Sequence, residues 1–226
     1  SFRYKVFSFC EYIILHKNDV TAVVVTNKMK DHYQKKYPNN NVKFVNYVIF
    51  PNNLKAISIP SILSADEHVN FVYAGNLQQW QNIDLMIENI ALHINNERYY
   101  FYILTGELER MREILAQRIS DFSRISLQSV PPSQLAEVYK ICHYGFVLRD
   151  DIVVNNVACP TKIIEYMHYG IVPVVLNDSI GDFESYHYER VLIDDINDLK
   201  PYKSLKNIAI IEEMKEKNAE VDIYSL

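Results

Sequence analysis

The segment Ala158–Val175, ACPTKIIEYMHYGIVPVV, passes from a proline through a helical pattern and a glycine into an unbroken apolar run. Pro160 or Thr161 is well suited to begin a helix, because the first turn of a helix does not need the amide hydrogen that proline lacks. The run after Gly170 is rich in valine and is typical of a strand buried on both faces. The segment therefore predicts a short helix that leads directly into a core strand.

Five other apolar, β-branched or aromatic runs follow residue 70. They are FVYAG from Phe71, YYFYILTG from Tyr99, ISLQSV from Ile125, YGFVLR from Tyr144 and RVLIDD from Arg190. Segments with helical spacing separate most of these runs, and such alternation indicates a parallel sheet covered by helices on both faces. The predicted fold class is α/β, with a Rossmann-like doubly wound parallel sheet over residues 70–195.

The chain before residue 70 predicts fewer elements. They are a helix over residues 1–17, a strand over 20–27, a helix over 28–37, a strand over 42–52 and a linker over 53–70. After the predicted sheet, the tail begins as an amphipathic helix and then loses its pattern.

Composition is that of a globular protein, with 226 residues, 49% of them hydrophobic and 23% charged. A net charge of -5 gives no reason to expect a nucleic acid as partner. The three cysteines, Cys10, Cys142 and Cys159, match neither a disulfide framework nor a zinc site. Together with the lack of a signal peptide or membrane-spanning run, this predicts a cytoplasmic protein. The histidines show no metal-binding spacing, so no metal is expected.

Ligands of an open α/β sheet bind beyond the carboxyl ends of the strands, where the strand order reverses. Gly75 follows the first of the six predicted strands and allows a tight turn into a helix whose amides can hold an anion. The loop AGNLQQWQN has only one glycine, so a dinucleotide site is weakly supported. An ordinary turn at the end of a strand explains Gly75 equally well.

The helix expected at Thr161 follows the fourth predicted strand. Its first amides, at Thr161 and Lys162, together with the helix dipole would favour a diphosphate. Glu165 lies one turn further on, where a carboxylate can accept hydrogen bonds from a ribose diol. By spacing alone, an exposed Lys162–Glu165 surface pair is the better explanation, and such a pair contributes only about 0.3 kcal/mol.

Four segments in this order resemble the C-terminal, donor-binding half of GT-B glycosyltransferases, in the large retaining group often called family 4. The segments are VTAVVVTNKMKDHYQKKY, FVYAGNLQQWQNIDLMIENI, VPPSQLAEVYKICHYGFVLRD and VNNVACPTKIIEYMHYGIVPVVLNDSIGD. The last is the most specific, because it holds the P-T-K, E-Y and G-x-x-P-V elements in register. The resemblance covers approximately residues 18–195.

The resemblance implies a donor-binding site built from several loops. It implies that Glu165 binds the nucleotide ribose and that the amides near Thr161 and Lys162 meet the diphosphate. The other implied contacts are Gly75 and Asn76 at the phosphates, Thr105 and Gly106 beside the nucleotide, Val130 in the loop 129–131 that holds the base, and Asn156 in the loop 155–159 that lines the sugar pocket.

Two departures from the family pattern affect the implied site. The family often carries an E-x7-E pair, but Val157 stands where the first acid would precede Glu165. The arginine and lysine that often clamp the diphosphate after the glycine loop are also absent. Gln79 occupies that region and is a candidate donor-binding residue instead. Arg149 and Lys162 are the candidates for the missing charge, and no catalytic residue is assigned.

The resemblance implies an enzyme that moves a sugar from a nucleotide diphosphate sugar to the hydroxyl of a saccharide or lipid-linked acceptor, with retention of configuration. Polysaccharide or glycoconjugate assembly is the implied role, with no cofactor, and peripheral contact with the inner membrane face is an option for the full-length protein. The alternatives are a GT-B-fold nucleotide-sugar epimerase and a non-catalytic nucleotide-sugar-binding domain.

The resemblance also implies a division of the chain. Residues 1–30 would be the last elements of an otherwise missing acceptor domain, residues 31–200 the donor-binding domain, and residues 201–226 a C-terminal helix and tail. The chain alone is therefore expected to be inactive as a fragment.

Overall fold

The computed structural model describes residues 2–57 and 67–225. The six predicted strands form one sheet in which every pair of neighbours is parallel. They are β3 (Val69–Ala74), β4 (Tyr99–Leu104), β5 (Ile125–Gln128), β6 (Tyr144–Phe146), β7 (Val172–Val175) and β8 (Val191–Leu192). Their order is β5-β4-β3-β6-β7-β8, so the direction of winding reverses between β3 and β6. The predicted doubly wound α/β fold is confirmed.

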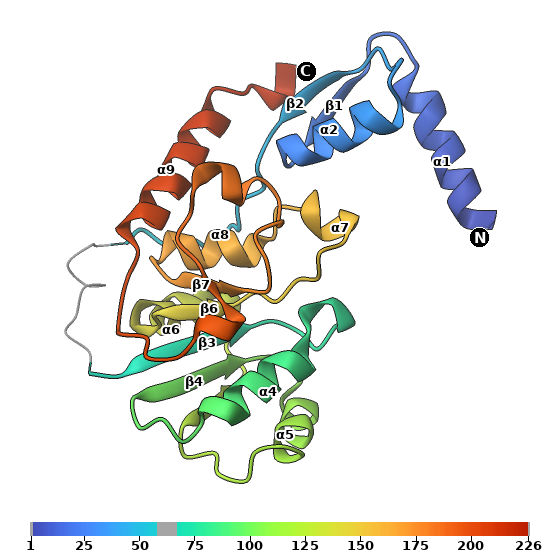
Figure 1. Cartoon of the computed structure of the whole chain (residues 1–226). Coiled ribbons are helices and arrows are strands. Elements are labelled where there is room, and N and C mark those ends of the chain that lie inside the picture. Colours follow the sequence, from blue (N-terminus) through green and yellow to red (C-terminus); the bar gives the residue numbers. More distant parts are fainter. Residues whose placement is uncertain (1, 58–66, 226) are drawn as a thin grey trace.

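Helices cover both faces of this sheet (Figure 1). On one face lie α4 (Ile83–His93) and α5 (Leu108–Ala116), and on the other lie α6 (Leu135–Ile141), α8 (Thr161–His168) and α9 (Leu205–Ala219). Successive strand residues point to opposite faces, so Phe71 belongs to the core beneath α4 and α5 and Val72 to the core beneath the other three helices. Both are fully buried.

The segment Ala158–Val175 folds into the predicted helix and strand. Gly145, outside this segment, allows helix α8 to approach the sheet closely. A Cβ at Gly145 in β6 would lie 2.4 Å from the ring of Tyr166, which is fully buried on α8. The hydroxyl of Tyr166 accepts a hydrogen bond from the Ala74 amide at 3.1 Å. Gly170 ends the helix with a φ of +67°, a conformation that glycine adopts without strain. Helix α8 is therefore held close to the ends of β3 and β6.

The N-terminal segment has a sheet of its own. It comprises α1 (Phe2–Leu15), β1 (Thr21–Val24), α2 (Asn27–Lys36) and β2 (Lys43–Asn46), and β1 pairs with β2 in parallel. The boundary predicted at residues 30–31 falls inside α2, and the division into domains stays a prediction. Figure 1 shows α1 extending away from the rest of the chain, and Leu15 is the one buried residue of that helix.

The remaining elements are short. They are α7 (Val153–Asn156) and the 3-10 turns η1 (Gln79–Gln81), η2 (Pro132–Gln134), η3 (Phe183–Tyr186), η4 (Ile193–Asp195) and η5 (Ile223–Ser225). The strand predicted over 42–52 is limited to Lys43–Asn46, and residues 58–66 of the predicted linker lie outside the described residues. The predicted C-terminal helix is α9. In the described part of the chain, no helix has the length and apolar character that crossing a membrane requires.

Candidate functional site

A cavity of about 220 Å³ opens at the carboxyl ends of β3 and β4, next to the reversal of strand order. The ends of these two strands, the loop after β5, and helices α6 and α8 provide its lining. Five residues that the resemblance implied lie in that lining, namely Gly75, Thr105, Gly106, Val130 and Glu165. The fold thus brings together side chains and backbone that are up to 90 residues apart in sequence.

Glu165 provides the carboxylate of this cavity. It is half-buried, and the hydroxyl of Tyr139 donates a hydrogen bond to its Oε2 at 3.0 Å. Burial raises the pKa of Glu165, while the Tyr139 hydrogen bond and the nearby Lys162 charge act in the opposite direction. A carboxylate at the wall of a partly apolar cavity can accept the hydroxyl hydrogens of a sugar.

Lys162 lies beside the same cavity and has little compensation for its charge. Its Nζ donates to Oε1 of Gln81 at 3.2 Å and lies 4.3 Å from the centre of the Tyr73 ring. Burial, followed by the nearby Arg149 charge, lowers the pKa of Lys162 to about 7. Among the described residues, none of the ion pairs includes Lys162.

Arg149 follows β6 and supplies the second cation. Its Nε is buried, and within residues 2–57 and 67–225 that atom has no hydrogen-bond partner. Burial lowers the pKa of its guanidinium. A buried donor without an acceptor is costly, so this group is suited to an acceptor that arrives with a ligand.

Together these two side chains form a cationic site at the end of β3. After burial, the Arg149 charge is the second cause that lowers the pKa of Lys162. A Cβ on Gly75 would come within 2.6 Å of the Lys162 Nζ, so the glycine leaves the space that the ammonium group occupies. Two neighbouring cations with few acceptors can bind an anion with charge-assisted hydrogen bonds.

The first turn of α8 faces the same region. Helix α8 begins at Thr161 with Pro160 as its N-cap, and the Thr161 side chain is exposed. Its first amides have no carbonyl within the helix to bind, as at any helix start. The exposed Lys162–Glu165 surface pair that spacing favoured is absent, because both side chains are half-buried and each has other partners.

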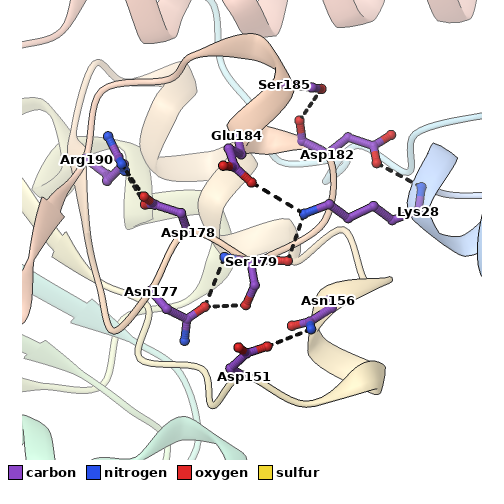
Figure 2. A network of polar contacts seen from close by, with 10 residues as sticks. All are labelled: Lys28, Asp151, Asn156, Asn177, Asp178, Ser179, Asp182, Glu184, Ser185 and Arg190. Atoms are coloured by element: carbon purple, nitrogen blue, oxygen red, sulfur yellow. Dashed lines mark hydrogen bonds and ion pairs between the residues drawn. The ribbon is translucent and has the colours of Figure 1, made fainter.

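The loop implied to line a sugar pocket, residues 155–159, comprises the end of α7 and the residues that lead to α8. Asn156 donates from Nδ2 to Oδ1 of Asp151 at 2.7 Å, and its own Oδ1 is a buried acceptor without a partner in the described chain (Figure 2). The carbonyl of Val157 accepts a hydrogen bond from Oγ1 of Thr26 at 2.6 Å. A Cβ on Gly181 would lie 2.3 Å from the Ala158 carbonyl oxygen. Contacts from two other parts of the chain therefore fix this loop.

Asp182 joins the N-terminal segment to the chain between β7 and β8. Its carboxylate accepts hydrogen bonds from the amides of Asn27 at 2.5 Å and Lys28 at 3.0 Å, at the start of α2. Figure 2 shows Lys28 reaching across to Glu184 and to the carbonyl of Ser179. A carboxylate at a helix N-terminus is stabilised by the helix dipole. The beginning of α2 is thus tied to the chain between β7 and β8.

Asn76 and Gln79 are not among the residues that line the cavity. The side chain of Asn76 is exposed, and its carbonyl accepts a hydrogen bond from the Tyr73 hydroxyl at 2.5 Å. Gln79 lines a separate groove of about 500 Å³ between η1, α4 and α5, together with Asn82 and Arg110. Whether the implied residues bind a donor stays a prediction.

The sequence interpretation missed three residues that build the site. Tyr139 holds Glu165, while Tyr73 and Gln81 hold Lys162. No local pattern identifies them, because each contact joins elements that are distant in sequence. Among the described residues, there is no group of three or more histidine, cysteine or acidic side chains able to hold a metal ion, and the expectation of a metal-independent site stays untested.

Comparison of the sequence with family models and with curated proteins finds no match. Comparison with solved structures finds the same fold in proteins of very low sequence identity. TarM of S. aureus, in a structure with UDP, has a TM-score of 0.64 at 11% identity, covering 98% of this chain and 44% of TarM. WaaG, a glycosyltransferase involved in lipopolysaccharide biosynthesis, has a TM-score of 0.62 at 14% identity, covering 100% of this chain and 66% of WaaG.

Sucrose-phosphate synthase from Thermosynechococcus elongatus has a TM-score of 0.56 at 13% identity. The alignment covers 96% of this chain and 53% of the synthase. The chain thus has the fold of GT-B glycosyltransferases, as the resemblance implied, and it spans less than two thirds of the length of each of these neighbours.

Proposed function

We propose that this chain, with its GT-B fold, is the donor-binding half of a glycosyltransferase. The proposed donor is a nucleotide diphosphate sugar, and the acceptor is the hydroxyl of a saccharide or lipid-linked molecule. The nucleoside occupies the 220 Å³ cavity, with the base near Val130 and the ribose at Glu165. The role in polysaccharide or glycoconjugate assembly and the cytoplasmic location are part of the same proposal.

The observation that carries this proposal is the cationic site beside the Glu165 cavity. Lys162 has a pKa lowered to about 7, and Arg149 has a buried donor without a partner in the described chain. Such an arrangement is costly in the free protein, and an incoming anion would relieve the cost. The cations adjoin the carboxylate that would hold the ribose, which matches the order of groups in a nucleoside diphosphate.

The proposed reaction uses this charge at the leaving group. The bond between the anomeric carbon and the diphosphate oxygen breaks, and the diphosphate leaves with the bonding electrons. Lys162, Arg149 and the first amides of α8 stabilise the negative charge that develops on it. The acceptor hydroxyl oxygen forms the new bond to the anomeric carbon, its proton passes to the departing diphosphate, and we propose retention of configuration at that carbon.

A non-catalytic nucleotide-sugar-binding domain is the second candidate, and Val157 favours it. An apolar side chain stands where the resemblance implied an acid, and the Val157 carbonyl is held by Thr26. Sugar transfer or donor hydrolysis by the full-length protein, tested with a panel of acceptors, would speak for the enzyme. Binding without turnover, unchanged when Val157→Glu is introduced, would speak for the binding domain.

Calorimetric titration of the chain with UDP, GDP and ADP tests the proposed site. We expect one of them to bind, and Glu165→Ala to weaken that binding about 10-fold, as for a lost hydrogen bond to a charged group. Glu137→Ala is the matched control, because Glu137 forms an exposed pair with Lys140 on α6. Lack of binding by all three nucleotides, or equal binding by Glu165→Ala, would contradict the proposal.

A further inference from the structure

Tyr139 of helix α6 contacts the carboxylate of Glu165, which belongs to helix α8. Its side chain is 1% exposed, and its hydroxyl donates to Oε2 of Glu165 at 3.0 Å. The two residues belong to α6 and α8, which flank the cavity on the same face of the sheet. A buried hydroxyl that donates to one carboxylate oxygen restricts the rotation of the carboxylate and leaves the other oxygen for a different donor.

The Tyr139 ring is fixed independently of this hydrogen bond. It packs edge-on against Tyr166 at a centroid distance of 5.6 Å and at a tilt against Tyr169 at 5.4 Å. Its carbonyl accepts a hydrogen bond from Nζ of Lys203 at 2.8 Å. The hydroxyl therefore has a defined position, and rigid support of this kind pre-organises a binding group.

We propose that Tyr139 is a positioning residue that holds Glu165 so that its Oε1 accepts a ribose hydroxyl of the bound nucleotide. This inference rests on the proposed function. Tyr139 acts through the carboxylate, and neither the base nor the diphosphate depends on it. The same hydrogen bond stabilises the ionised form of Glu165, which is the form that accepts a hydroxyl at both oxygens.

The first test compares a ribonucleotide with its counterpart that lacks the ribose diol. Tyr139→Phe keeps the ring and removes only the hydroxyl. We expect the Kd for whichever of UDP, GDP or ADP binds to rise about 10-fold, and the Kd for its 2′,3′-dideoxy counterpart to stay unchanged. Equal weakening of both nucleotides, or no change in either, would overturn the inference.

Tyr169→Phe is the matched control. Tyr169 is buried beside Tyr139, but its hydroxyl accepts a hydrogen bond from the Lys55 amide at 3.1 Å and does not touch Glu165 in the described structure. We expect it to leave the discrimination between the two nucleotides unchanged. The double variant Tyr139→Phe/Glu165→Gln should bind the ribonucleotide no more weakly than Glu165→Gln alone, because Tyr139 acts through Glu165.

The second test does not require a nucleotide. Tyr139, Lys162 and Asn53 are the groups that lower the pKa of Glu165 against the effect of burial. Titration of the Glu165 carboxyl carbon by NMR should therefore give a higher pKa in Tyr139→Phe than in the unaltered chain. An unchanged pKa would overturn the inference even if nucleotides bind, whereas a raised pKa in a chain that binds no nucleotide would contradict only the proposed function.

Discussion

A lysine lies at each end of helix α8. Lys162 is half-buried and belongs to the first turn of the helix, whereas Lys203 is buried and comes from the chain before α9. At the first turn, Lys162 has a side-chain amide oxygen, an aromatic face and a neighbouring arginine. At the other end, Lys203 is 5% exposed, and its Nζ donates to the carbonyls of Tyr139 and Tyr169 at 2.8 and 3.0 Å. Burial lowers the pKa of Lys162 to about 7 and that of Lys203 to about 8.

The two ammonium groups differ in their hydrogen-bond acceptors and in the helix dipole that they meet. Lys203 binds carbonyls at the ends of α6 and α8, where a cation interacts favourably with both helix dipoles. Lys162 lies at the start of α8, where the dipole favours an anion and opposes a cation. Lys203 therefore joins two helices at one end of α8, whereas Lys162 is a poorly compensated charge at the other end.

Replacing Lys162 should have the largest effect on binding. Lys162→Met should weaken nucleoside diphosphate binding roughly 10- to 100-fold, as expected for lost charge-assisted hydrogen bonds. Binding of the corresponding nucleoside should change little. Calorimetry with UDP and uridine, or with the pair whose base binds, measures both quantities.

The same variant should be more stable than the unaltered chain, because it removes a poorly compensated charge. Lys140→Met serves as control, since Lys140 is a more exposed lysine paired with Glu137 on α6. If Lys162→Met binds the diphosphate normally, the contrast between the two lysines has no functional meaning.

Replacing Lys203 should act on stability instead. Lys203→Met keeps a similar shape but leaves the carbonyls of Tyr139 and Tyr169 without this donor. We expect the free energy of unfolding to fall by about 2 kcal/mol, because buried acceptors lose a hydrogen bond. Urea unfolding monitored by circular dichroism measures the change. Equal or greater stability would show that burying this charge costs as much as its two hydrogen bonds contribute.

The pH dependence of stability separates the two lysines. Each has a pKa below the usual 10.5, so above its native pKa the unfolded chain binds more protons and stability rises with pH. Between pH 7 and 8.5 the unaltered chain should gain about 2 kcal/mol, roughly two thirds of it from Lys162, whose pKa is the lower. The gain should persist in Lys203→Met and be largely lost in Lys162→Met. The urea unfolding midpoints of the three proteins at the two pH values measure these gains in stability. A gain in Lys162→Met equal to that of the unaltered chain would contradict the assignment of the gain to Lys162.

The smallest effect is expected at Gly75. In Gly75→Ala the added Cβ would come within 2.6 Å of the Lys162 Nζ, and the flexible lysine side chain can move away. Nucleoside diphosphate binding should weaken about 3-fold, while stability changes by less than about 1 kcal/mol. Thermal unfolding and calorimetry on the same sample check both. A large loss of stability instead would show that the buried Tyr73 ring, whose hydroxyl would lie 3.0 Å from the added Cβ, cannot move aside.

The fold could be predicted from the sequence because its signals are local. The helix at Thr161 and the strand after Gly170 follow from residues a few positions apart, and the other five strands alternate with helical segments. The strand predicted over residues 42–52 was too long, because only Lys43–Asn46 pairs with β1. The extent of a strand depends on its partner, which no local pattern specifies.

By itself, the sequence determined the doubly wound sheet and predicted the region of the candidate site, since periodicity sets each element and parallel strands present their carboxyl ends together. The tertiary structure alone decided which side chains contact one another in that region. Spacing on α8 favoured an exposed Lys162–Glu165 pair, but Tyr139 of α6 binds Glu165, and Tyr73 and Gln81 contact Lys162. The physical reason is that burial and charge compensation are properties of neighbours in space, and here those neighbours come from α6, β3 and η1.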